Sequence, residues 1–438
     1  MSHVLHKSDL HELIVLEDKH NDESIKVDDG GKGNAHFIDE HHLVLHKDGK
    51  VDDRTTIYDP FKFKEILENY RDTRRAVLEQ SLQKLGVERF SKDEVHKMKW
   101  DILGAKIKNW IHYMRISVKL LFAMEKKNCN QIMDGVEPLR DQSFAEITTV
   151  SFDMLLSFGY AIAISRSPDK QFVMIDMYEI MREFQSEFEL LFASKPCTEM
   201  KEDALNLTKL LAQTVQETIA DFEDAVEMDT TETAVIDGSV HPLTSYVVTY
   251  VKYLFDYKST LRLIFQEFDS ANDPDTELRS AIRGIMRALR NNLDGKSRQY
   301  EEAALTQLFL MNNMYYIVRN FKRTEEARNW LGDDWVQTYG RIVQQHAQRY
   351  QTISCNKLLQ CITVQSSDSS SIEDENITKT LVEDKFNTFN SQFEELHQRQ
   401  CQWIVPDIEL RESLRLAIAE ILLPPYKSFL KLNGYINF

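Results

Sequence analysis

The chain has 438 residues, of which 42% are hydrophobic and 28% are charged, the balance of an ordinary globular protein. Its 53 Lys and Arg residues against 70 Asp and Glu give a net charge of −17. A nucleic-acid partner is not expected, because so acidic a surface repels phosphates. No apolar run approaches the roughly 20 residues that span a bilayer, and no apolar signal core begins the chain. We therefore expect a cytoplasmic protein.

The cysteines are odd in number and widely separated, at Cys129, Cys197, Cys355, Cys361 and Cys401. This pattern predicts neither a disulfide framework nor a zinc ribbon, and it fits a reducing compartment. Three histidines at positions 41, 42 and 46 could bind a metal weakly, but no H-E-x-x-H motif fixes their geometry. A solvated tail is the favoured interpretation, and we expect no metal and no cofactor.

Residues 1–56 are polar and include Asp28-Asp29-Gly30-Gly31-Lys32-Gly33, which predicts a flexible tail. The body begins near Asp59-Pro60. Apolar residues then recur at spacings of three and four over 107–122, which predicts a helix with one packed face. Similar stripes predict helices over 61–85, 142–165, 170–193, 201–228, 243–267, 277–293, 297–321 and 380–400.

The breaks between these stripes are short and polar, for example at 134–138, 165–169 and 271–275. Short connections make consecutive helices antiparallel neighbours. A longer break near 365–378, rich in Ser and Asp, predicts a disordered loop. The expected fold is therefore all-α, an elongated rod of stacked antiparallel helical hairpins over 57–438.

Two segments resemble catalytic motifs but lack essential parts of them. Asp294-Gly295-Lys296-Ser297 looks like the end of a phosphate-binding loop, but Arg290 occupies the place of the earlier glycine. Gly238-Ser239-Val240-His241 puts Ser near His without the G-x-S-x-G elbow. We interpret the first as a helix boundary and the second as a helix cap. The sequence thus predicts no catalytic residue and no enzymatic activity.

Two further structural predictions come from the positions of polar residues and prolines. Asn312 and Asn313 lie inside an apolar helix, where an unpaired amide is costly to bury. At least one of them is therefore expected to bond a neighbouring helix or loop. Pro406-Asp407 is predicted to begin a helix that Pro424-Pro425 ends. Its buried stripe is expected to comprise Leu410, Leu414, Ile418 and Leu422.

Longer motifs follow one another over residues 70–430. The most specific are Phe309-Leu310-Met311-Asn312-Asn313, Tyr316-Ile317-Val318 and Gly332-Asp333-Asp334-Trp335. Others are Leu85-Gly86-Val87-Glu88-Arg89-Phe90-Ser91, His241-Pro242-Leu243-Thr244 and Val405-Pro406-Asp407. In this order they resemble the seventy-kilodalton subunit of the exocyst complex in its plant form.

The resemblance implies a non-enzymatic helical protein that tethers secretory vesicles to the plasma membrane by binding other proteins. Its implied partners are other exocyst subunits, small GTPases and anionic phosphoinositides, and its implied location is peripheral, at the plasma membrane or on secretory vesicles. The family places lipid binding in its C-terminal part. Here the candidate lipid-binding residues are Lys427 and Lys431.

The ends of the chain depart from the family pattern. Residues 1–56 show no heptads, and the chain stops at Phe438 without a basic-aromatic stretch. We therefore expect it to lack the family's N-terminal coiled coil and basic C-terminal tail. An alternative function is a stand-alone binding module, or a decoy targeted by pathogen effector proteins in plant immunity. The sequence does not indicate which face binds a partner.

Overall fold

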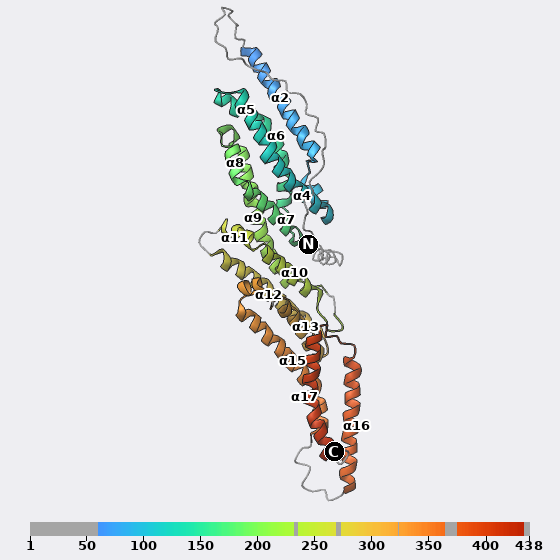
Figure 1. The fold of residues 1–438 in the computed structure, drawn as a ribbon. Coiled ribbons are helices and arrows are strands. Elements are labelled where there is room, and N and C mark those ends of the chain that lie inside the picture. Colours follow the sequence, from blue (N-terminus) through green and yellow to red (C-terminus); the bar gives the residue numbers. More distant parts are fainter. Residues whose placement is uncertain (1–59, 232–234, 269–272, 323, 364–374, 433–438) are drawn as a thin grey trace, which may run out of the picture. The chain divides into compact units, whose positions relative to one another are not determined.

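The computed structural model describes residues 60–432, except 232–234, 269–272, 323 and 364–374. Within these ranges every regular element is helical and no strand occurs, so the all-α prediction is confirmed (Figure 1). The predicted tail, 1–56, lies outside the described residues. The chain divides into two compact units, 1–77 and 78–438, and the division falls within helix α2 (Pro60–Leu85).

The second unit contains the last turns of α2 and all later helices. Its first half comprises α3 (Lys92–Lys97), α4 (Trp100–Ile116), the π-helix η1 (Ser117–Phe122), α5 (Ala123–Ile132), α6 (Glu137–Ala163), α7 (Pro168–Glu183), α8 (Gln185–Leu191), the 3₁₀ turn η2 (Lys195–Cys197) and α9 (Thr198–Glu227). Its second half comprises α10 (Pro242–Asp256), α11 (Lys258–Gln266), α12 (Pro274–Ser297), α13 (Ala303–Phe321), α14 (Glu325–Leu331), α15 (Asp333–Ile362), α16 (Glu375–Gln400) and α17 (Ile408–Leu432).

Three predicted helices are interrupted in the structure. The stripe over 107–122 runs from α4 into the π-helix η1. The predicted helix 170–193 divides at Phe184, and 243–267 divides at Tyr257, where the backbone leaves helical angles for one residue. Both aromatic side chains stay in contact with the fold, so the apolar stripe continues across each break. Periodicity alone therefore could not locate these interruptions.

Helix α15 was not predicted, although it is 30 residues long. Its buried positions keep the helical spacing, but several carry polar groups, including Tyr339, His346, Tyr350 and Ser354. A stripe with hydroxyl and imidazole groups is a weak apolar signal. The groups are satisfied by specific bonds: Tyr339 donates to the Met286 carbonyl at 3.2 Å, and His346 bonds Gln307 at 2.8 Å.

One prediction near the C-terminus is wrong. Pro424 and Pro425 do not end α17, which continues to Leu432. Both prolines are exposed, so water can bond the carbonyls that lack a helical N–H partner, while Phe429 beyond them is buried. The loop predicted near 365–378 stays a prediction, because its residues 365–374 lie outside the described part. Residues 375–378 belong to α16.

Within the second unit, helices pack in succession along the chain. Helix α6 packs on α5 and α9, α9 packs on α7 and α12, and α13 packs on α15. Helix α15 in turn contacts α16 and α17 (Figure 1). The helices are therefore stacked, and most of these contacts join helices that are two or three apart in the chain.

The contact between α6 and α9 depends on a glycine. Trp110 of α4 donates its indole N–H to the Leu155 carbonyl of α6 at 2.7 Å, and Thr214 of α9 donates to the Ala163 carbonyl at 2.7 Å. At Gly159 a Cβ atom would lie 2.6 Å from Leu207 Cδ2 and 3.4 Å from a Trp110 ring carbon. The two helices can approach this closely because position 159 has no side chain.

We therefore expect Gly159→Ala to destabilise the protein by roughly 1–3 kcal/mol, because Leu207 and Trp110 are buried and must be displaced. The control is Gly104→Ala in α4, where a Cβ atom meets nothing within 4 Å. That variant should gain about 0.5–1 kcal/mol from helix propensity. Urea unfolding of both variants is the measurement. A Gly159→Ala variant as stable as Gly104→Ala would show that α6 and α9 are not tightly packed.

Candidate interaction site

Two buried asparagines of α13 bond separate segments of the chain. The Asn313 Oδ1 atom accepts hydrogen bonds from the His241 backbone N–H at 2.9 Å and the Thr244 hydroxyl at 2.6 Å. The Asn312 Nδ2 atom donates to the Gly238 carbonyl at 2.7 Å and the Ile404 carbonyl at 2.9 Å. The prediction that at least one asparagine bonds a neighbouring segment is confirmed.

We call this cluster, residues 237–241 with Asn312, Asn313 and residues 404–407, the α13 junction. Ile404 donates its backbone N–H to the Asp237 carbonyl at 2.8 Å, and the Arg319 guanidinium pairs with the Asp407 carboxylate. Gly238 has a φ of 71°, and a Cβ atom there would lie 2.7 Å from Leu305 Cδ1. The junction thus fixes the segment before α10 and the segment before α17 to one helix.

The two segments that resemble catalytic motifs are structural. His241 is the N-cap of α10, and its Nδ1 atom accepts from the Leu243 N–H at 3.1 Å, which confirms the predicted cap. Helix α12 ends at Ser297, which confirms the predicted boundary. Lys296 donates to the carbonyls of Asp229 and Thr231 and pairs with the Asp229 carboxylate at 3.1 Å. The Lys296 ammonium group therefore joins the end of α12 to the segment that follows α9.

Tyrosine hydroxyls near the junction are kept neutral. Burial raises the pKa of Tyr300 to about 12, with a smaller contribution from the Asp237 carboxylate. The Tyr300 hydroxyl donates to the Val235 carbonyl at 2.7 Å. Burial also raises the pKa of Tyr315, and the nearby Asp407 carboxylate adds to the effect. These phenols act as hydrogen-bond donors at neutral pH.

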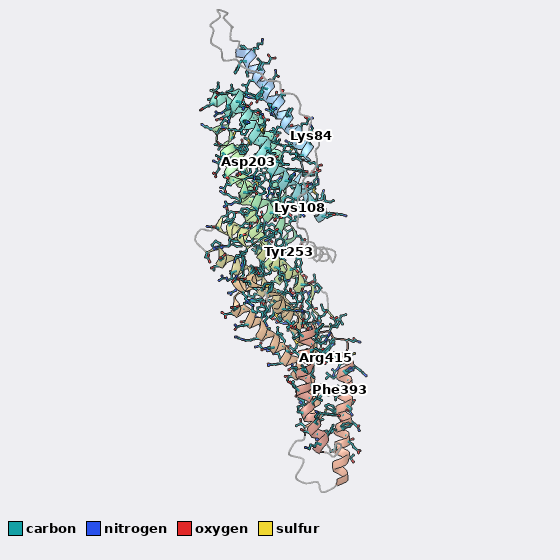
Figure 2. The ribbon with its side chains drawn as sticks, viewed as in Figure 1. Lys84, Lys108, Asp203, Tyr253, Phe393 and Arg415 are labelled. Carbon is teal, nitrogen blue, oxygen red and sulfur yellow. The ribbon has the colours of Figure 1, made fainter. Side chains whose placement is uncertain are left out.

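Beyond the junction, α15, α16 and α17 share a small core of their own. Its buried members are Leu358, Ile362, Phe389 and Phe429. Phe389 stacks on Tyr426 of α17 with ring centroids 5.0 Å apart. Phe393 of α16 and Arg415 of α17 mark the two helices in Figure 2. The junction therefore anchors the start of α17, and this core anchors its end.

The two predicted lipid-binding residues lie together at that end. Lys427 and Lys431 are both exposed and are one helical turn apart on α17. Leu423, four residues before Lys427, is 49% exposed. The arrangement gives a short face with two cations and an apolar residue, which can contact an anionic surface but holds no group suited to bond making.

The described residues contain no cluster of three or more His, Cys, Asp or Glu side chains that could hold a metal ion. None of the described helices is both long enough and apolar enough to cross a membrane. One charged feature was not predicted from the sequence. Helix α12 exposes a row of four arginines, at positions 279, 283, 287 and 290. Their spacing of four, four and three residues in the sequence could have predicted this row.

Replacement of Asn313 by Ala should destabilise the protein by about 2–3 kcal/mol, because the His241 N–H and the Thr244 hydroxyl lose a buried acceptor. Asn320→Ala is the matched control on the same helix. Asn320 is partly exposed and bonds only the Tyr316 carbonyl of its own helix among the interactions described, so less than about 1 kcal/mol is expected. Equal midpoints for the two variants in urea unfolding would contradict the role of the junction.

Comparison with known proteins places this fold in a family. The family model that describes the C-terminal part of the Exo70 exocyst complex subunit matches residues 108–437. The chain is 63% identical to exocyst complex component EXO70A3 of Arabidopsis thaliana over 503 residues, covering 97% of this chain and 84% of the relative. It is 58% identical to EXO70A1 of the same plant over 377 residues, covering 84% of this chain and 59% of the relative.

Among solved structures, Saccharomyces cerevisiae Exo70 aligns with 85% of this chain and 72% of its own, at 14% identity and a TM-score of 0.46. The exocyst tethers vesicles in exocytosis, and the alternative of a pathogen-targeted decoy is not favoured. The motifs that suggested the resemblance supply the bonds of the α13 junction, and the family match covers most of the sequence. The chain therefore belongs to the Exo70 family of exocyst subunits, in its plant branch.

Proposed function

We propose that this chain acts in vesicle tethering as a non-enzymatic scaffold whose exposed helical faces bind other exocyst subunits. The observation that supports this most is the family match over residues 108–437 together with 63% identity to a plant exocyst component. The fold is consistent with it: the polar motif residues His241, Lys296 and Asn313 bond within the protein. We therefore expect the residues that bind partners to lie on the exposed helix faces.

The same proposal places the chain at the cytoplasmic side of the plasma membrane or on secretory vesicles. Lys427 and Lys431 support it, because each cation near an anionic leaflet contributes about 1 kcal/mol. Two such charges give weak binding by themselves. We therefore infer that contact with anionic phosphoinositides adds to binding by protein partners. Small GTPases remain a prediction from the family resemblance, and pathogen effectors belong to the alternative function.

Purification of the tagged chain from plant cells at low and at moderate salt should recover other exocyst subunits in both conditions. Recovery at the higher salt is expected because contacts between subunits bury apolar surface that salt does not screen. Mass spectrometry identifies the recovered proteins. Loss of all exocyst subunits, with a different partner retained at both salt concentrations, would contradict assembly into the complex.

The double variant Lys427→Gln and Lys431→Gln should bind vesicles containing anionic phosphoinositide about thirtyfold more weakly than the unmodified chain. The matched control is Lys97→Gln with Lys127→Gln, which removes two exposed charges from helices α3 and α5. Sedimentation with vesicles measures the binding. If the control variant weakens binding as much as the test variant, net charge and not the α17 face is responsible.

A further inference from the structure

Helix α12 has one face in the core and an opposite face that carries four arginines. Its buried face includes Leu278, Ile282, Ile285 and Leu289. The residues of the arginine column, Arg279, Arg283, Arg287 and Arg290, are all exposed. The spacing of four, four and three residues places them in one row, and the rise of a helix makes this row about 16 Å long. The row is a strip of positive charge in a chain of net charge −17.

Contacts with neighbouring helices orient the column and leave its charge available. Arg283 donates from Nη2 to the Leu331 carbonyl at the end of α14, at 2.6 Å. Arg287 donates to the Glu223 carboxylate of α9 at 3.1 Å, yet its side chain stays 72% exposed. Each guanidinium has five N–H donors, so these bonds occupy a small part of the total.

Two further charged groups, one basic and one acidic, lie near the C-terminal end of the column. Burial lowers the pKa of His346 on α15, and the positive charges of Arg349 and Arg290 lower it further. Arg349 is exposed and therefore adds a cation from α15 beside the end of the column. The Asp294 carboxylate lies in the same neighbourhood and offsets part of this charge.

On its other side the column is bounded by acidic residues of α9. Asn291 of α12 donates to the Glu227 carboxylate at 3.1 Å, and Arg287 reaches Glu223, so α9 runs alongside α12 (Figure 1). Asp224 and Glu227 are exposed on α9. The positive strip is therefore about one helix wide. A broad anionic surface, such as a membrane, would bring its charges against these carboxylates, whereas a narrow ligand would not.

We propose that the arginine column is a docking site for an acidic α-helix of a protein partner, with carboxylates spaced three and four residues apart along one face. The planar guanidinium binds a carboxylate through two parallel hydrogen bonds, which gives this pairing geometric selectivity. A partner helix of about three turns would match the length of the column. Such a contact would contribute mainly to specificity and to the rate of association.

The probe is a fluorescent alanine-based peptide of about 18 residues, or five helical turns, with glutamates alternately four and three residues apart. A second peptide has the same composition, with its glutamates distributed around the helix. Fluorescence anisotropy measures binding to the full chain at low salt. The unmodified chain should bind the first peptide more tightly than the second, because only the first presents one acidic row.

The test variant is Arg279→Gln, Arg287→Gln and Arg290→Gln. Arg283 is kept because it bonds the Leu331 carbonyl. The control, Lys97→Gln, Lys127→Gln and Lys209→Gln, removes the same charge from exposed positions on α3, α5 and α9. The test variant should bind the first peptide about tenfold more weakly, from three exposed ion pairs, and the control should bind like the unmodified chain.

The proposal is overturned if the unmodified chain binds neither peptide, if it binds both equally, or if test and control variants lose the same affinity. Preference for phosphatidylserine vesicles over the peptide would assign the column to a membrane instead. Thermal unfolding checks that each variant folds. If the triple variant does not fold, Arg279→Gln alone should weaken binding about two- to threefold. None of these outcomes affects membership of the Exo70 family.

Discussion

The carboxamide of Asn313 has no contact with solvent, and its bonds hold the start of α10 against α13. Together with Asn312 it joins the segment before α10 to the segment before α17, which are separated by more than 150 residues in sequence. Within a buried site these amides have no water as an alternative partner. The position of α17, and through Phe429 that of the C-terminal core, therefore depends on hydrogen bonds made by one turn of α13.

This arrangement explains why the most specific sequence motifs do not identify the residues that bind partners. Asn312 and Asn313 cannot be replaced by apolar residues without leaving acceptors or donors of other segments unpaired. His241 caps a helix, and Lys296 closes a loop. Such residues are constrained by the fold. Residues that meet a partner lie on exposed helix faces, where many side chains are compatible with folding, so they form no conspicuous motif.

The sequence was most informative where apolar spacing was regular and least informative where polar groups were buried. The apolar stripes predicted the positions of α6, α9 and α12. The local residues predicted the helix cap at His241 and the helix boundary at Ser297. Helix α15 escaped detection because tyrosine, histidine and serine occupy its buried face. Pro424 and Pro425 wrongly predicted the end of α17. Their exposure lowers the free-energy cost of the helical hydrogen bonds that they remove, and the burial of Phe429 offsets the rest. The sequence predicted Lys427 and Lys431 as candidate lipid-binding residues, but the structure was needed to show that they share one face of α17.

The π-helix η1 has a consequence for variation in chain length. It lies between α4 and α5 and accommodates one residue more than an α-helix of the same rise. Deletion of one residue within η1 would restore the α-helical register and leave the residues that follow on their present faces, because the wider turn holds the extra residue. Cys129 and Glu125 would then stay buried. The same deletion within α4 would rotate everything after it by about 100° around the helix axis and turn these two residues away from the core. Within this stretch, a single-residue deletion is therefore best tolerated at η1.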